Sequence, residues 1–189
     1  MNVVALSGGV GGAKLALGLS RCLDAAELTI VANTADDFTH LGLRICPDLD
    51  TVMYTLAEIS NRAVGWGQQD ETWHCLDALS NLGAESWFRL GDRDLATHLV
   101  RSEQLQSGET LSDVTTYLCQ RLNIAHRLVP MSDQTVSTQV DTVEGRLSFQ
   151  HYFVRERCEP QVTGFEFEGV ETARPSPGFQ TCLLYTSDA

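Results

Sequence analysis

The feature that most constrains the fold of this chain is a glycine-rich turn near the N-terminus. Val3–Leu6 is a short apolar run typical of a buried strand, and it ends at the glycine-rich segment Ser7–Lys14. Leucines four residues apart then give residues 15–23 one apolar helical face. Leu28–Ala32 is a second β-rich run. Strand, turn, helix and strand in this order predict a βαβ unit with two parallel strands.

Four glycines within five positions are more than a plain strand-to-helix turn needs. Gly8, Gly9, Gly11 and Gly12 would let backbone amides approach an anion at the positive end of a helix. The turn therefore indicates a phosphate or nucleotide site. Neither common template fits it. A P-loop would need a glycine where Ala13 stands and a hydroxyl where Leu15 stands, and G-x-G-x-x-G read from Gly9 puts Lys14 at its last glycine.

Charge and composition limit the possible partners. The formal net charge is −12, which does not attract the phosphates of a nucleic acid. A phosphate ligand in such an acidic chain needs backbone amides and a divalent cation. No apolar run approaches the length of a membrane span, and Met1-Asn2 lacks the basic segment of a signal peptide, so we expect a cytoplasmic protein without a membrane partner. The six cysteines form no C-x-x-C pair and are typical of reduced core residues.

Acidic residues occur in three close pairs. Any one pair is typical of a helix cap or a solvated loop. One of them, however, follows Asn33, just past the carboxyl end of the second strand, which is the ligand edge of an open parallel sheet. Together the pairs suit Mg²⁺ that bridges phosphates. The pairs are Asp36 with Asp37, Asp48 with Asp50, and Asp92 with Asp94.

The third pair lies in a segment with two arginines, Arg89 and Arg93, in a chain that has only 13 lysines and arginines. Each arginine could form a surface ion pair with a neighbouring acid, or it could hold a phosphate with its planar fork. His98 falls within the helix that we expect to begin at Asp94. A hydrogen-bonded structural histidine is favoured there over a catalytic one.

The remaining pattern predicts one α/β domain, a Rossmann-like open parallel sheet with flanking helices that is truncated at its C-terminus. Residues 1–177 would form the N-terminal portion of that domain, and residues 178–189 would be a non-matching tail of foreign sequence, without a terminal helix or strand. The other expected elements are a helix capped by Asp48, helices over Asp70–Leu82 and Asp94–Val100, a helix after a capping box at Thr110–Asp113, and strands over Val136–Val140 and Leu147–Phe149 joined at Glu144-Gly145.

Eight motifs in order give the chain a resemblance to the 2-phospho-L-lactate transferase family, from about Met1 to Pro177. They are Leu6–Lys14, Asn33–Phe38, His40–Leu43, Pro47–Tyr54, Gly65–Gly67, Leu90–His98, Pro130–Asp133 and Phe149-Gln150.

The resemblance implies a Mg²⁺-dependent reaction of coenzyme F420 biosynthesis. A guanylylated phospholactate or phosphoenolpyruvate is the donor, the ribityl hydroxyl of the deazaflavin precursor FO is the acceptor, and GMP leaves. It also implies a homodimer for a full-length chain. Two alternatives remain: a non-enzymatic regulator of the gluconeogenesis-factor type that binds nucleotide sugars, and an atypical nucleotide kinase, which Leu15 disfavours.

The resemblance also implies roles for individual residues. Asp50 and Arg89, with Asp92 and Asp94, are the expected deazaflavin contacts. Asp37 and Asp50 are the expected metal ligands, or they hold the attacking hydroxyl. Asp50→Asn should then abolish transfer and leave the fold intact. The expected contacts of the donor phosphates are Gly8, Gly9, Gly11, Gly12, Lys14 and Asn33.

Overall fold

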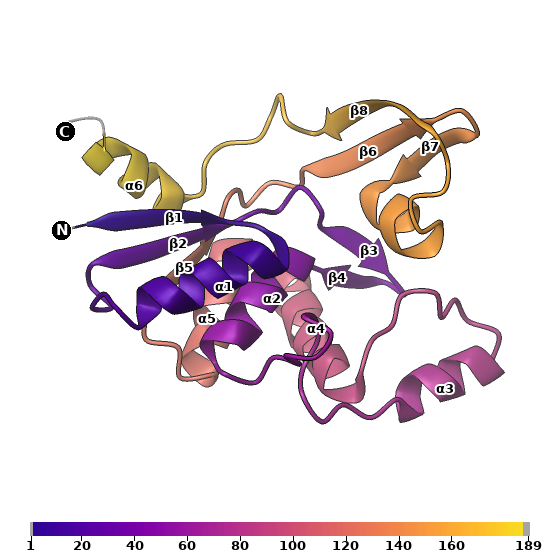
Figure 1. Ribbon diagram of the computed structural model, residues 1–189, viewed down its shortest axis with the longest axis horizontal. Helices are drawn as coiled ribbons and strands as arrows, with labels where there is room; N and C mark the ends of the chain where they lie inside the picture. The colour runs from indigo at the N-terminus through magenta and orange to yellow at the C-terminus, as the bar shows by residue number, and fades with distance from the viewer. Residues whose placement is uncertain (1, 187–189) are drawn as a thin grey trace.

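The glycine turn joins a strand to a helix in a parallel sheet, in a computed structural model that describes residues 2–186 (Figure 1). Strand β1 (Val3–Ser7), helix α1 (Gly9–Ser20) and strand β2 (Leu28–Ala32) form the predicted βαβ unit, and β1 and β2 are parallel. A third strand, β5 (Arg127–Pro130), pairs in parallel with the other edge of β2, so the order is β1-β2-β5. The α/β class and the parallel sheet are confirmed.

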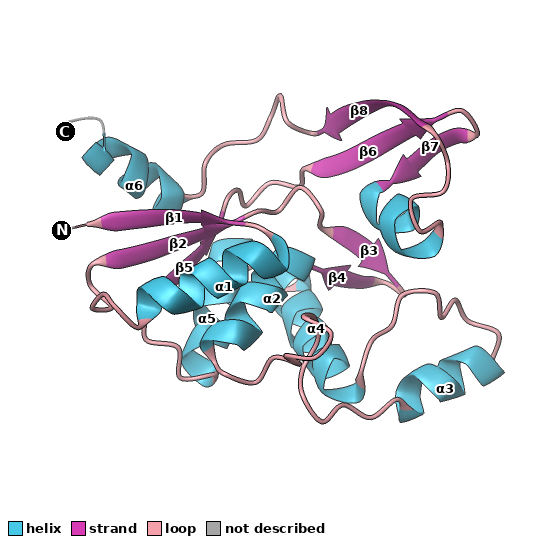
Figure 2. Ribbon diagram, in the orientation of Figure 1, coloured by secondary structure: helices cyan, strands magenta, loops and turns pink. Residues whose placement is uncertain are grey.

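Helices cover one face of this sheet (Figure 2). They are α1, α2 (Pro47–Leu56) and α5 (Leu111–Arg121), and α4 (Asp92–Gln106) packs beside α5. The main core lies between them and the sheet. It includes Ala5, Ile30 and Leu128 from the strands and Ala16, Val52 and Val114 from the helices. Within residues 2–186 no helix has the length and apolar character needed to cross a membrane.

Antiparallel pieces stand beside the parallel sheet. They are the hairpin of β3 (Phe38–His40) and β4 (Leu43–Ile45), and a three-stranded sheet, β7-β6-β8, built from β6 (Ser137–Thr142), β7 (Gly145–Ser148) and β8 (Val162–Glu168). A short π-helix, η1 (His151–Arg155), follows β7. The predicted hairpin is confirmed, since β6 and β7 pair antiparallel around the turn before Gly145.

Helix boundaries are the main differences from the expected elements. The capping box is confirmed, because Thr110 accepts a hydrogen bond from the Asp113 backbone and Asp113 reciprocates. Helix α3 (His74–Asn81) is shorter than expected, and α4 continues past Val100. The expectation that Asp48 caps its own helix is wrong: the N-cap is Cys46, and the Asp48 side chain caps α1 instead.

The C-terminal segment holds a further element, α6 (Pro177–Thr186), so the expectation of no terminal helix is wrong for residues up to 186. The helix packs against β5, on the face of the sheet opposite the main core. The Ser176 hydroxyl donates to the Pro130 carbonyl at 2.6 Å, and Cys182 is buried, whereas Leu183 and Leu184 are exposed. Foreign origin of the tail stays a prediction, and residues 187–189 lie outside the described part.

Candidate active site

The glycine turn holds a carboxylate at the start of α1. Gly9 has φ of +58°, which glycine adopts without strain, and its N–H donates to Asp48 Oδ1 at 2.6 Å. Asn33 Nδ2 donates to Asp48 Oδ2 at 2.9 Å. Gly12 lies so close to β1 that an added Cβ would be 2.5 Å from Ser7 Oγ. Asp48 therefore ties the turn to the end of β2 and already occupies the positive end of the helix.

A hollow of about 310 Å³, called here the turn hollow, opens beside this turn at the carboxyl ends of the parallel strands. Its lining residues are Leu6, Ser7, Gly8, Val31, Ala32, Asn33, Met131 and Phe179. The Ser7 hydroxyl is buried and has no hydrogen-bond partner among the described residues. Of the predicted phosphate contacts, Gly8 and Asn33 line the hollow, while Gly11 and Lys14 are exposed on α1.

Two neighbouring aspartates after β2, Asp36 and Asp37, have too little positive charge nearby to offset the burial of their carboxylates. Burial, and then the nearby charge of Asp48, raises the pKa of Asp36 to about 6. Burial raises the pKa of Asp37 to about 7, although Arg44 Nη2 lies 3.3 Å from Asp37 Oδ2. Asp37 Oδ1 is buried without a hydrogen-bond partner among the described residues. The ionised forms of both aspartates would therefore gain from a further cation.

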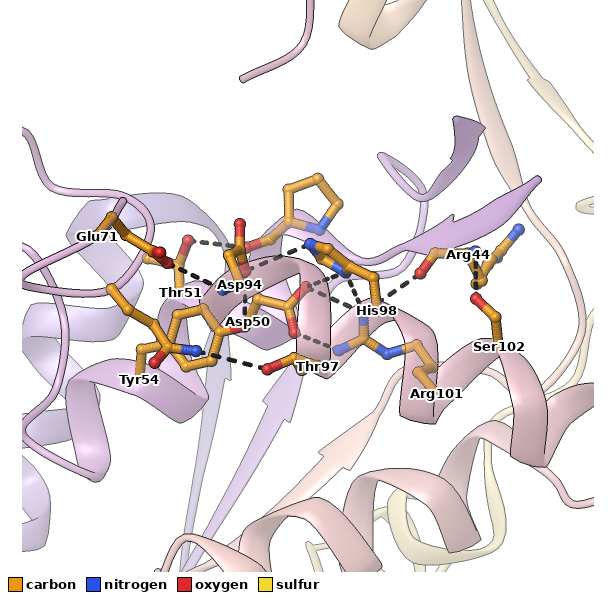
Figure 3. Close-up of polar contacts among 12 residues, drawn as sticks. Arg44, Asp50, Thr51, Tyr54, Glu71, Asp94, Thr97, His98, Arg101 and Ser102 are labelled. Carbon is orange, nitrogen blue, oxygen red and sulfur yellow. Dashed lines mark hydrogen bonds and ion pairs between the residues drawn. The ribbon is translucent and has the colours of Figure 1, made fainter. Parts of the chain in front are cut away.

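Asp50 has its counter-charge inside the fold, at the contact between α2 and α4 (Figure 3). The guanidinium of Arg101 donates to both oxygens of Asp50, and all of these groups are buried. Arg101 Nη1 also lies 3.2 Å from His98 Nδ1. Since an arginine can only donate, His98 Nδ1 accepts and its proton sits on Nε2. The cation next to Asp50 is thus Arg101.

The same contact between α2 and α4 continues to Asp94. The hydroxyl of Tyr54 donates to Asp94 Oδ1 at 2.7 Å, and His98 Nε2 lies 3.3 Å from the same oxygen without hydrogen-bond geometry. Burial alone would raise the pKa of Asp94, but contact with His98 and Tyr54 lowers it below its usual value. Burial, with Asp50 and Asp94 nearby, raises the pKa of Tyr54 well above the usual value, so its hydroxyl stays a donor.

Asp94 also lines a second hollow, of about 90 Å³, called here the tryptophan hollow. Its other lining residues are Asn61, Val64, Trp66, Gly67, Gln68, Glu71, Trp73, Arg89 and Gly91. The guanidinium carbon of Arg89 lies 4.3 Å from the centre of the Trp73 ring. Of the two alternatives for Arg89, an ion pair with a neighbouring acid is not found within residues 2–186, and binding of a ligand stays a prediction. The stacking on Trp73 is a cation–π contact instead.

A third hollow, of about 370 Å³, shares Trp73 and Arg89 with the tryptophan hollow and lies against α3. Asp92 does not line either space. Its carboxylate accepts from the Thr72 hydroxyl at 2.5 Å and from the His74 and Cys75 backbone, which fixes the start of α3. The role of Asp92 as a substrate contact stays a prediction.

The structure brings the predicted residues together in two groups. Asp48, Asn33 and the turn form one group, and Asp50 with Asp94 forms the other, while Asp37 is paired with Arg44 between β2 and β4. Sequence reasoning missed Arg101, Arg44, Tyr54, Trp66 and Trp73. One signal for Arg101 is present, because positions 94, 98 and 101 share one helical face and carry only ionisable side chains.

The family model described as 2-phospho-L-lactate transferase CofD matches residues 3–184. A phosphoenolpyruvate transferase of Streptomyces avermitilis is 45% identical over 183 residues, which cover 94% of this chain and 57% of that protein. A phosphoenolpyruvate transferase of Mycobacterium sp. (strain KMS) is 46% identical over 198 residues, covering 94% of this chain and 60% of that protein. The chain thus spans about three fifths of the length of these relatives.

Among solved structures, a member of the UPF0052 family from Bacillus halodurans aligns with a TM-score of 0.60 and 14% identity. The alignment covers 94% of this chain and 53% of that one. At this identity the likeness shows the fold alone.

Proposed function

The chain belongs to the 2-phospho-L-lactate transferase CofD family, and on this basis we propose that it carries the acceptor site and part of the donor site of a transferase of coenzyme F420 biosynthesis. The donor is a guanylylated three-carbon phosphate and the acceptor is the deazaflavin FO. The terminal ribityl oxygen of FO forms a bond to the donor phosphorus. The bond from that phosphorus to GMP breaks, and the hydroxyl proton and GMP leave.

The observation that carries the proposal is the neighbourhood of two unlike hollows. Because Asp48 already accepts from the turn backbone, the donor that the turn hollow offers to a phosphate is the Ser7 hydroxyl, which has no hydrogen-bond partner among the described residues. The tryptophan hollow and the hollow that adjoins it share Trp73 and Arg89, whose flat faces suit an aromatic ligand. Their loops touch, because an added Cβ at Gly65 would be 3.2 Å from Val10 in the first turn of α1. Donor and acceptor can therefore meet beside α2, which carries both Asp48 and Asp50.

Magnesium fits part of the predicted ligand set. Asp37 has a buried carboxylate oxygen without a hydrogen-bond partner in residues 2–186, and burial raises the pKa of both Asp36 and Asp37. These two residues would hold a divalent cation, which would neutralise charge on the donor phosphates. Asp50 fits less well, since Arg101 occupies both of its oxygens. Within residues 2–186 no three acidic, histidine or cysteine side chains form a ready metal cluster. We therefore propose Asp50 as the anchor of Arg101.

The names of the relatives, phosphoenolpyruvate transferase in each case, favour the enolpyruvyl donor over the lactyl one. The test is a transfer assay with FO, Mg²⁺ and each guanylylated donor, followed by separation of GMP and of the new deazaflavin. The proposal expects GMP release only when FO is present, with faster turnover of the enolpyruvyl donor. Release of GMP at the same rate without FO would contradict it.

A further inference from the structure

We infer that Tyr54 is a positioning residue for the acceptor: it fixes Asp94 through Oδ1, so that Asp94 Oδ2 accepts a hydrogen bond from a hydroxyl of the acceptor's polyol chain. This inference rests on the proposed function, because it takes FO as the acceptor. It concerns a buried side chain whose hydroxyl donates to Asp94 Oδ1 (Figure 3).

The two oxygens of Asp94 have different surroundings. Both interior groups, the Tyr54 hydroxyl and His98 Nε2, approach Oδ1. Oδ2 accepts no hydrogen bond from any of residues 2–186, yet it is not among the buried oxygens without a partner, so solvent or a ligand reaches it. The residue lines the tryptophan hollow. A carboxylate with a lowered pKa and one free oxygen is a strong acceptor for a ligand hydroxyl.

The sizes of the two hollows assign the parts of the acceptor. The tryptophan hollow, at about 90 Å³, has room for a few non-hydrogen atoms, which suits the end of a polyol chain. The adjoining hollow, at about 370 Å³, has room for the fused ring. Trp73 and Arg89 line both, so one ligand can occupy the two spaces with its ring against them and its hydroxyls toward Asp94.

The chemistry of the α2–α4 contact supports a positioning role. Tyr54 is fully buried, and a phenylalanine ring would fill the same space without needing a partner. Its hydroxyl instead holds a carboxylate at the wall of the hollow. Behind it, Arg101 fixes the ring of His98 through Nδ1. The face of α4 that meets α2 thus presents Asp94 in one orientation.

The test measures binding of FO by fluorescence, and binding of GMP as a second probe, in the wild-type chain and four variants. The variants are Tyr54→Phe, Asp94→Asn, the double variant, and Tyr117→Phe as a matched control with an exposed hydroxyl on α5. We expect Tyr54→Phe to weaken FO binding about 3- to 10-fold and Asp94→Asn about 10-fold or more, with GMP binding unchanged. Tyr117→Phe should match the wild type.

The double variant separates positioning from structure. If Tyr54 acts through Asp94, adding Tyr54→Phe to Asp94→Asn changes FO binding less than twofold. Losses of FO affinity that add up in the double variant, or normal FO binding by Tyr54→Phe, would overturn the inference. The proposed function would still stand in that case, provided that the wild type binds FO. No FO binding by the wild type would overturn both. Should a variant not fold, the wild type alone decides: it must bind FO about tenfold more tightly than the same ring with a methyl group in place of the polyol chain.

Discussion

At the scale of single residues, the buried carboxylates of this site are stabilised in three different ways. Asp50 has the full guanidinium of Arg101, and Asp94 has the hydroxyl of Tyr54. Asp37 has a contact to Arg44, and its other oxygen has no hydrogen-bond partner in the described part of the chain. Because these surroundings differ, substitution of each aspartate has a different expected effect on stability, pH dependence and binding.

Asp37 should make the fold less stable as the pH rises. Its pKa is about 7 in the folded chain against 3.8 for the ordinary group, so the folded state holds a proton that the unfolded state has lost. The contribution of Asp37 to the free energy of unfolding is therefore fully present below about pH 4, and it is lost as the pH rises through 7. Asp36, with a pKa of about 6, acts in the same direction. Asp37→Asn should flatten the dependence by roughly 2–3 kcal/mol between pH 5 and 8 in urea denaturation. The exposed Asp24→Asn should leave the dependence as in the wild type, and an unchanged slope in Asp37→Asn would contradict the assignment.

Asp50→Asn should lower the stability of the fold, contrary to the expectation from sequence that it leaves the fold intact. The change removes the charge from a buried pair and leaves Arg101 without its counter-ion. Breaking such a pair costs about 3 kcal/mol or more. Thermal and urea denaturation measure the loss. A variant as stable as the wild type would show that Arg101 finds another partner, and Asp50 would return to the set of metal ligands.

Arg89 should contribute to acceptor binding with little effect on stability. Its guanidinium is exposed and stacks on Trp73 at the wall of two hollows. Arg89→Ala should weaken FO binding about ten- to a hundredfold, and Arg89→Lys should also weaken it, since lysine lacks the flat face that lies over the ring. Fluorescence titration measures both. Arg21→Ala, which breaks an exposed ion pair with Glu58, is the control. Normal affinity in both Arg89 variants would limit Arg89 to packing on Trp73.

At the scale of elements, the turn before α1 depends on how closely the helix approaches β1. An added Cβ at Gly12 would be 2.5 Å from Ser7 Oγ and 3.0 Å from Ser7 Cα, whereas at Gly11 it would meet nothing within 4 Å. Gly12→Ala should therefore cost about 1–3 kcal/mol, because backbone must shift. Gly11→Ala should be neutral or stabilise by about 0.5–1 kcal/mol, because alanine favours the helix. Urea denaturation of the Gly11→Ala and Gly12→Ala variants compares the effect of the same substitution on the free energy of unfolding at two adjacent positions. Equal effects would show that helix propensity and not close packing explains these glycines.

The elements that could be predicted from sequence are those with a local cause. The glycine turn predicts the βαβ unit, and the Thr110–Asp113 box predicts the start of α5. The hairpin β3–β4 could not be predicted, because three-residue strands are too short to show a period of two. The helix α6 could not either, since exposed leucines on it blur its apolar face.

The residues of the candidate site also divide into those with a local sequence signal and those without one. The acidic pairs predict carboxylates near the turn, and Asp48 is indeed there. Their partners come from helices far along the chain: Arg101 is 51 residues from Asp50, and Asp94 is 40 residues from Tyr54. Local pattern carries no information on which arginine neutralises which acid, because packing of α4 against α2 decides it.

At the scale of the whole molecule, the glycine turn lies at the carboxyl ends of the parallel strands, and α2 and α4 carry acidic groups from there to the tryptophan hollow. We propose that the tryptophan hollow and the hollow that adjoins it bind a deazaflavin. The most direct measurement is titration of the wild-type chain with FO, followed by FO and tryptophan fluorescence, with a nucleotide sugar as the competing probe. We expect saturable FO binding with quenching of Trp73, an effect that Trp73→Phe reduces, and no displacement by the nucleotide sugar. Binding of the nucleotide sugar together with no response to FO would rule out a deazaflavin site here and favour the regulator of the gluconeogenesis-factor type.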